Sequence, residues 1–261
     1  MSRLERIFAE SQTQPRALIP YLTIGDPTLD ASRAIALALA EAGADIIELG
    51  VPFSDPVADG PVIQAASQRA LAQGVHLSDV LATARAIRDR SKVGLLLFSY
   101  YNPILRYGLE PFARDAAAAG CDGVLVTDLI PEEAGDYRRI LQAAGLDTVF
   151  LVAPTSPPER LGAIAAASSG FIYAVSRLGV TGGSTSAGSS RDLIAELRRH
   201  TKLPVAVGFG IASAEQVSAV AAYADGAVVG SALVSAIAAA APGTEAAAAA
   251  RFLKGLRNGH R

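Results

Sequence analysis

Four segments of the chain share one pattern, in which an alanine-rich stretch ends and a short apolar run begins. Their sequences are AGADIIEL at 42–49, AGCDGVLV at 119–126, AGLDTVFL at 144–151 and the looser AYADGAVV at 222–229. Gly43, Gly120 and Gly145 suit the left-handed backbone position that ends a helix, which glycine adopts without a Cβ clash. Continuous apolar runs are typical of parallel strands that are buried on both faces. The pattern therefore predicts a chain built from helix-then-strand units.

Extending this pattern along the sequence predicts eight strands, at 17–23, 45–49, 93–98, 123–127, 147–152, 170–175, 204–208 and 226–229. Helical patterns are found at 30–42, 61–72, 78–90, 109–119, 132–143, 158–167, 190–199, 213–222, 231–241 and 245–257, and amphipathic spacing at 1–12. Eight such units in 261 residues favour a closed barrel. We expect an α/β fold, a single (β/α)8 TIM barrel over residues 1–261 with an extra N-terminal helix and additional helices.

Charge and composition exclude several classes of protein. The net charge is −2 with scattered lysines and arginines, which is unlike the basic surface that binds nucleic acid. The uncharged segment 226–244 is rich in alanine and glycine and contains serines and Pro242, so we interpret it as a strand and a helix and not as a membrane span. The N-terminus lacks the pattern of an export signal, and the single cysteine, Cys121, forms no intrachain disulfide. We expect a cytoplasmic protein.

Two carboxylates lie at the end of the second predicted strand and in the loop that follows it. Glu48 lies among aliphatic residues, where burial raises a carboxyl pKa and prepares the group to act as a general acid. Asp59 lies in the loop VPFSDPVADGP at 51–61, from which it can face Glu48 across a pocket. A structural ion pair or a solvent-exposed carboxylate is the alternative for Glu48, and ordinary turn chemistry or helix capping is the alternative for Asp59.

Glycine-bearing turns follow the last three predicted strands, at 179–182, 208–210 and 230–231. Barrels of this class bind phosphate with backbone N–H groups of their last loops and a helix N-terminus. The three turns together therefore predict a phosphorylated substrate, although glycines also form tight turns without a ligand. The attached glycine- and serine-rich loop at 178–190 is expected to be a mobile lid or a disordered surface loop.

Aromatic residues near the strand ends are candidates for the wall of a flat substrate pocket, or for a plug of the barrel mouth. They are Tyr21, Phe98, Tyr100, Tyr101 and Tyr173. The three histidines are dispersed, and no spacing typical of a metal site is present. The first predicted strand runs into Gly25-Asp26-Pro27 and lacks the glycine pattern of a dinucleotide-binding turn. We expect neither a metal nor a dinucleotide.

Over nearly its whole length the sequence resembles the tryptophan synthase α subunits. The resemblance depends on YLTIGDP at 21–27, ELGVPFSDP at 48–56 with ADGPVIQ at 58–64, YNPI at 101–104, SRLGVTG at 176–182 and GFGI at 208–211. It implies that Glu48 and Asp59 are the catalytic carboxylates. It also implies phosphate contacts for Gly182, Gly210, Gly230 and Ser231. Tyr21, Tyr173 and Thr181 are further candidates for contacts with the substrate.

The implied reaction is the retro-aldol cleavage of indole-3-glycerol phosphate to indole and glyceraldehyde 3-phosphate. The resemblance also implies an α2β2 complex in which the β subunit holds pyridoxal phosphate and this chain holds no cofactor. Asp55 and Pro52 belong to the loop expected near that partner, as does Thr181. The segment GSTSAGSS at 183–190 departs from the charged or bulky stretch usual in the family, which predicts weaker ordering of the lid.

Three other functions fit parts of the sequence. A phosphosugar isomerase or aldolase would share the phosphate turns, but Lys92 and Lys202 precede strands and therefore lie at the wrong end of the barrel for a Schiff base. A non-catalytic barrel that only activates the β subunit would not need both carboxylates. A stand-alone indole-producing lyase would have the same sequence pattern as an α subunit.

Overall fold

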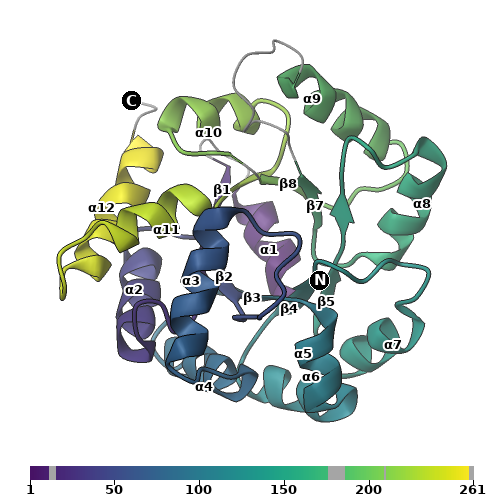
Figure 1. Cartoon of the computed structure of the whole chain (residues 1–261). Coiled ribbons are helices and arrows are strands. Elements are labelled where there is room, and N and C mark those ends of the chain that lie inside the picture. The colour runs from purple at the N-terminus through teal and green to yellow at the C-terminus, as the bar shows by residue number, and fades with distance from the viewer. Residues whose placement is uncertain (12–15, 176–185, 209, 259–261) are drawn as a thin grey trace.

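The computed structural model describes residues 1–11, 16–175, 186–208 and 210–258, which form a ring of helices around parallel strands (Figure 1). The strands are β1 (Ala17–Thr23), β2 (Ile46–Gly50), β3 (Gly94–Ser99), β4 (Gly123–Val126), β5 (Asp147–Val149), β6 (Leu151–Val152), β7 (Ile172–Val175), β8 (Val205–Gly208) and β9 (Gly226–Val229). Their order in the sheet is β5-β4-β3-β2-β1-β9-β8-β7-β6. The first and last strands in this order, β5 and β6, are separated in the chain only by Phe150. The sheet therefore closes on itself, as the sequence predicts.

The one predicted strand that differs is 147–152, which is divided at Phe150. Val149 and Leu151 face the interior of the barrel while Phe150 faces the helices, so the side chains alternate as in a single strand. The division arises because β5 pairs with β4 whereas β6 pairs with β7. This stretch is therefore the point at which the barrel closes.

The helices lie near the predicted positions. Their bounds are α1 (Arg3–Glu10), α2 (Leu29–Glu41), α3 (Pro61–Ala72), α4 (Leu77–Arg88), α5 (Tyr101–Tyr107), α6 (Leu109–Ala118), α7 (Gly135–Ala143), α8 (Pro158–Ala167), α9 (Ser186–Leu197), α10 (Ala214–Ala221), α11 (Ser231–Ala238) and α12 (Glu245–Asn258). No helix within the described ranges is long and apolar enough to span a membrane.

Two helical segments correct the sequence analysis. Residues 186–190, which we expected in the loop, belong to α9, because serines are tolerated in a first helical turn whose N–H groups have no intrahelical partner. Helix α5 was missed because it contains Pro103. That proline occupies the first turn, where a missing N–H breaks no helical hydrogen bond. The Asp128 carboxylate accepts a hydrogen bond from the Tyr101 N–H at 2.7 Å and fixes the start of α5.

The core has two parts that follow the alternation of the strands. Outward side chains pack against the helices, and inward side chains fill the barrel. Helix α1 lies inside the ring of helices in Figure 1 and buries Leu4 and Phe8 against residues that begin the strands, including Ala17 and Phe171. The N-terminal end of the barrel is thereby closed, which leaves the C-terminal end for a site.

Three of the four repeated junctions, those that contain Asp45, Asp122 and Asp225, share an atomic structure at this closed end. Asp122 precedes β4, and its carboxylate accepts hydrogen bonds from the Leu95 N–H of β3 and from Arg88, both at 2.8 Å, while Arg3 lies 3.2 Å away. Gly43, Gly120 and Gly145 have positive φ as predicted. We call this arrangement a clamp: an aspartate accepts a hydrogen bond from a strand N–H and pairs with an arginine. A second clamp joins Asp45 to Leu18 and Arg257, and a third joins Asp225 to Val205 and Arg198.

Removal of one clamp should destabilise the fold. Asp122→Ala leaves the Leu95 N–H without its acceptor and removes the carboxylate partner of the half-buried Arg88, which keeps only backbone carbonyl acceptors. Loss of one partner of a buried pair costs about 3 kcal/mol or more. We expect the free energy of unfolding in urea to fall by that amount. The control is Asp89→Ala, which breaks the exposed pair with Arg85 and should change the same quantity by less than ~0.5 kcal/mol. Equal effects of the two variants would contradict a structural role of the clamp.

Candidate active site

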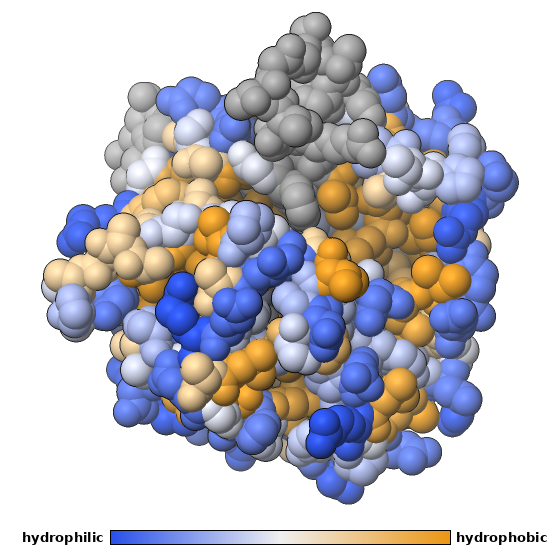
Figure 2. Space-filling model, in the orientation of Figure 1, coloured by the Kyte–Doolittle hydropathy of each residue, from blue (hydrophilic) through white to orange (hydrophobic). Residues whose placement is uncertain are grey.

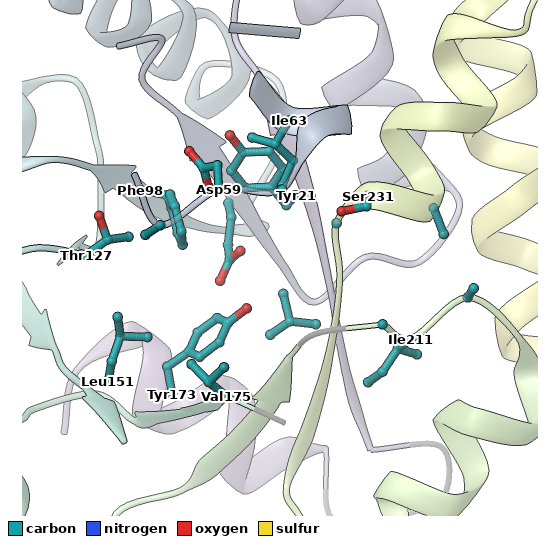
Figure 3. A pocket seen from close by; sticks show the side chains of 18 residues that line it. Tyr21, Asp59, Ile63, Phe98, Thr127, Leu151, Tyr173, Val175, Ile211 and Ser231 are labelled. Atoms are coloured by element: carbon teal, nitrogen blue, oxygen red, sulfur yellow. The ribbon is translucent and has the colours of Figure 1, made fainter. Parts of the chain in front are cut away.

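A cavity of about 440 Å³ opens at the C-terminal ends of the strands and contains both predicted carboxylates (Figure 3). Its lining comes from the inner faces of the strands and from the loops that follow them. The lining residues are Tyr21, Glu48, Ala58, Asp59, Gly60, Ile63, Phe98, Thr127, Leu151, Tyr173, Val175, Gly210, Ile211, Ala212, Val228, Gly230, Ser231 and Ala232. Glu48 and Asp59 are the two side chains with carboxyl groups in this set, and the cavity wall is otherwise largely apolar.

Glu48 faces the interior because β2 alternates and Ile46, two residues earlier, points into the barrel. Its side chain is 1% exposed, and its Oε1 atom has no hydrogen-bond partner among the residues that the structure describes. Burial raises its pKa from the ordinary value of 4.5 to about 8. The alternative of a structural ion pair is not observed among those residues. Glu48 is therefore a buried carboxylic acid that keeps its proton at neutral pH.

This protonation state has a measurable consequence for stability. Between pH 4.5 and about 8 the unfolded chain has lost the proton that folded Glu48 retains, so stability falls as the pH rises through this window. Glu48→Gln carries no such proton. We compare the free energy of unfolding of this variant with that of the unmodified chain. The difference, variant minus unmodified, should increase by roughly a few kcal/mol between about pH 5 and about pH 9, because only the unmodified chain loses stability through Glu48. Urea unfolding across this range tests the expectation, and a difference independent of pH would contradict it.

Asp59 lies in the loop between β2 and α3 and is half-buried. Its Oδ2 atom accepts a hydrogen bond from the Tyr100 hydroxyl at 3.1 Å. Burial raises its pKa, and the hydrogen bond from Tyr100 opposes that rise. The alternative of helix capping is wrong, because Gly60 is the N-cap of α3 and no side chain caps it. The two carboxyl groups thus share one cavity but have different surroundings (Figure 3).

The opposite side of the cavity is formed by backbone near the last strands. Gly210, Gly230 and Ser231 line it, and Ser231 begins α11. No side-chain hydrogen bond caps this helix, so its first N–H groups have no side-chain acceptor. The positive end of the helix dipole lies at this side of the cavity, because Gly230 and Ser231 line it. Thr181 and Gly182, and with them residues 178–185 of the predicted lid, lie outside the described residues.

Two of the predicted aromatic residues place the hydroxyl ends of their rings against glycines of the neighbouring strand. A Cβ at Gly50 would come within 2.2 Å of the Tyr21 hydroxyl, and a Cβ at Gly208 would come within 2.0 Å of the Tyr173 hydroxyl. Phe98 meets Tyr21 edge to face at 5.3 Å between ring centroids. These contacts keep the rings at the wall and leave the centre of the cavity open for a flat ligand.

The other two aromatic candidates do not line the cavity. Tyr101 packs against Tyr137, and Tyr100 contacts Asp59 from behind. Sequence analysis also missed several apolar lining residues, namely Ile63, Leu151, Val175, Ile211 and Val228. Their inward orientation depends on the register of the barrel, so an apolar run alone does not distinguish them from core residues.

Exposed apolar side chains lie on the segments that follow β2, β3 and β4. Val57 is 85% exposed, Leu105 51% and Ile130 44%. Asp55 is exposed on the same loop as Val57, whereas Pro52 is buried and supports the loop from within. Figure 2 shows apolar side chains among polar ones on the face of the molecule seen in Figure 1.

Known proteins share this sequence and this fold. The family model described as tryptophan synthase alpha chain matches residues 8–258. The tryptophan synthase alpha chain of Roseiflexus castenholzii is 49% identical over 260 residues, which cover 98% of this chain and 100% of that one. That of Solibacter usitatus is 52% identical over 236 residues, covering 90% and 88%.

Solved structures agree with this assignment. A chain of tryptophan synthase from M. tuberculosis, in its aminoacrylate-bound form, has a TM-score of 0.90 and 41% identity, with 100% of both chains covered. Tryptophan synthase subunit alpha from Legionella pneumophila has a TM-score of 0.90 and 36% identity, covering 98% of this chain and 97% of that one. The match in sequence and in fold extends over almost every residue, and the chain therefore belongs to the tryptophan synthase alpha chain family.

Proposed function

We propose that this chain cleaves indole-3-glycerol phosphate with Glu48 and Asp59 as its catalytic residues. Tryptophan synthase alpha chains are lyases of tryptophan biosynthesis that convert this substrate to indole and glyceraldehyde 3-phosphate, and the chain is an enzyme of this family. The observation that carries the residue assignment is the shared cavity. Two carboxyl groups in unlike environments line one side of it, and an uncapped helix N-terminus lies at the other.

Glu48 performs two proton transfers in the proposed mechanism. Its carboxylic acid protonates C3 of the indole ring, which produces a cationic indolenine and a Glu48 carboxylate. That carboxylate then accepts the proton of the hydroxyl on the adjoining carbon of the glycerol chain. The bond between this carbon and C3 breaks, its electron pair restores the indole ring, and the carbon becomes the aldehyde. Glu48 ends the cycle protonated, as it began.

Asp59 acts on the ring nitrogen. Its carboxylate accepts a hydrogen bond from the indole N–H and stabilises the positive charge that appears when C3 is protonated. This role requires an ionised Asp59 beside a protonated Glu48. The burial of Glu48 and the Tyr100 hydrogen bond to Asp59 support that division.

The phosphate group is assigned to Gly210, Gly230 and Ser231, together with Gly182, and the indole ring to the wall that includes Tyr21 and Tyr173. Peptide N–H groups and the α11 dipole bind a phosphate at the helix N-terminus. This end of the cavity has no lysine or arginine among its described lining residues. Lys92 and Lys202 precede β3 and β8 and do not line the cavity, so the described residues offer no Schiff-base lysine there.

The partner proposed for this chain is the β subunit of an α2β2 complex in the cytoplasm, with pyridoxal phosphate bound to β and no cofactor bound here. The exposed apolar residues Val57, Leu105 and Ile130 form the proposed contact surface, together with Asp55 of the loop that carries Val57. The family resemblance adds Thr181 to the proposed partner contacts. The support for this surface is that all three side chains are largely exposed and follow neighbouring strands of the sheet.

The experiment that tests the function is the release of indole from indole-3-glycerol phosphate by the purified chain, with and without a β subunit. We expect release by the chain alone, stimulation by β and co-elution of the two chains in gel filtration. Release without co-elution or stimulation would identify a stand-alone lyase. The absence of indole release under both conditions would refute the proposed activity.

A further inference from the structure

The hydroxyl of Tyr100 joins two residues of the catalytic loop. Tyr100 follows β3 directly, is 2% exposed, and packs its ring against Phe53 with 5.1 Å between ring centroids. The hydroxyl oxygen accepts a hydrogen bond from the Ala58 N–H at 2.9 Å. The hydroxyl also donates to Asp59 Oδ2 at 3.1 Å. One side chain therefore contacts two consecutive residues from behind the cavity that Ala58 and Asp59 line.

The hydrogen bond from Ala58 determines how the Tyr100 hydroxyl can be used. A backbone N–H can only donate, so the Tyr100 oxygen must accept from Ala58. A tyrosine hydroxyl has a single proton, which is then available for Asp59, while the Thr127 hydroxyl can donate its own proton to the Tyr100 oxygen. An ionised carboxylate accepts at both oxygens, whereas a protonated one has to place its own proton elsewhere. The arrangement consequently favours the ionised form of Asp59, and it leaves Oδ1 free of this contact.

We propose that Tyr100 is a positioning residue that holds Asp59 ionised and oriented toward the cavity through this directed pair of hydrogen bonds. The proposal rests on the role assigned above to Asp59. It gives Tyr100 a function distinct from that of the wall residues Tyr21 and Tyr173.

The other groups around Asp59 increase the need for such a donor. Glu48 of β2 shares the cavity, and the hydroxyls of Tyr21 and Tyr173 interact electrostatically with both carboxyl groups. On the same loop Asp55 is exposed, and from α3 the neutral Gln64 side chain donates to the Asp59 carbonyl at 2.8 Å. Beyond β4, Asp128 is engaged at the start of α5. Because none of these described side chains is cationic, Tyr100 is the donor that opposes the effect of burial on Asp59.

The test is Tyr100→Phe, which removes one oxygen and keeps the ring that packs on Phe53. The matched control is Tyr107→Phe, since the Tyr107 hydroxyl also donates to an aspartate, Asp115 at 2.8 Å, but far from the cavity lining. The pKa of Asp59 is measured by NMR on chains with 13C-labelled aspartate carboxyls, and its resonance is identified by its loss in Asp59→Asn. We expect Tyr100→Phe to raise this pKa by about one pH unit and Tyr107→Phe to leave it in place.

Activity provides the second measurement. The acid limb of kcat/KM against pH should move upward by the same amount in Tyr100→Phe, so that the variant loses about tenfold more activity on the acid side of the profile than at its plateau. A uniform loss at every pH, with an unchanged Asp59 pKa, would overturn the proposal and leave Tyr100 a structural role.

A third measurement needs no variant. In the unmodified chain the 13Cζ resonance of Tyr100 should titrate with the pKa of Asp59, because the hydroxyl donates to that carboxylate. A resonance that does not respond would overturn the proposal even if Tyr100→Phe failed to fold. These NMR results do not depend on catalysis, so failure of the proposal is distinguishable from failure of the proposed reaction, which is decided by indole release.

Discussion

Glu48→Gln should lower kcat for indole release by roughly three orders of magnitude while the chain still folds and binds substrate. Glutamine fills the same buried space on β2 but can neither donate a proton to C3 nor accept one from the substrate hydroxyl. Both proton transfers depend on this one group in the proposed mechanism, so their losses occur together. KM should change little, because Glu48 contributes to the transition state more than to ground-state binding.

The measurement is steady-state indole release at neutral pH, with unfolding followed in the same preparation. Glu41→Gln is the matched control, since Glu41 ends α2 at the surface, and its kcat should equal that of the unmodified chain. Near-normal turnover by Glu48→Gln would remove Glu48 from the mechanism. A loss of activity that accompanies unfolding would instead assign Glu48 to the fold.

Asp59→Asn should lower kcat by roughly two to three orders of magnitude. The amide has no negative charge with which to stabilise the cationic intermediate, and its nitrogen presents donors where the indole N–H needs an acceptor. Stability should change little, because Asp59 does not cap α3 and makes its described side-chain contact only with the Tyr100 hydroxyl.

The control for this variant is Asp136→Asn, which alters an exposed carboxylate in the first turn of α7. It should retain full activity. An Asp59→Asn chain that is less stable but turns over normally would contradict the catalytic role. If the loss in kcat is large and the loss in stability small, the carboxylate acts on the substrate.

The sequence allowed most of the fold to be predicted because its units are local. Each strand is a continuous apolar run, and each of Gly43, Gly120 and Gly145 marks a helix end whose backbone the structure reproduces. The errors occur where a local pattern is ambiguous. Pro103 concealed α5, and the serines at 186–190 concealed the start of α9. The division at Phe150 reflects which neighbour each half-strand pairs with, which no local pattern records.

The candidate site was predictable only in part. Glu48 was found because a carboxylate in an aliphatic strand is costly to bury, so its presence there indicates a functional or structural role. The clustering of Glu48 with Asp59, Gly210 and Gly230 depends on barrel closure, which brings residues from both halves of the chain to one cavity. Tyr100 was found as an aromatic residue but with the wrong role. At the end of β3 the alternation stops, so the sequence does not indicate which way either of two adjacent tyrosines points.

The pairing of β1 with β9 has a consequence for synthesis on the ribosome. One edge of β1 pairs with β2 and the other edge pairs with β9, while α2 packs against α12. The strand β1 and the helix α2 therefore lack β9 and α12, respectively, until the C-terminal part of the chain has been translated. A nascent chain must therefore carry an open strand edge through almost its entire elongation, and such edges pair readily with other chains. Premature termination before residue 226 would leave that edge permanently unpaired, so truncated products should aggregate even though most of their helix–strand units are present.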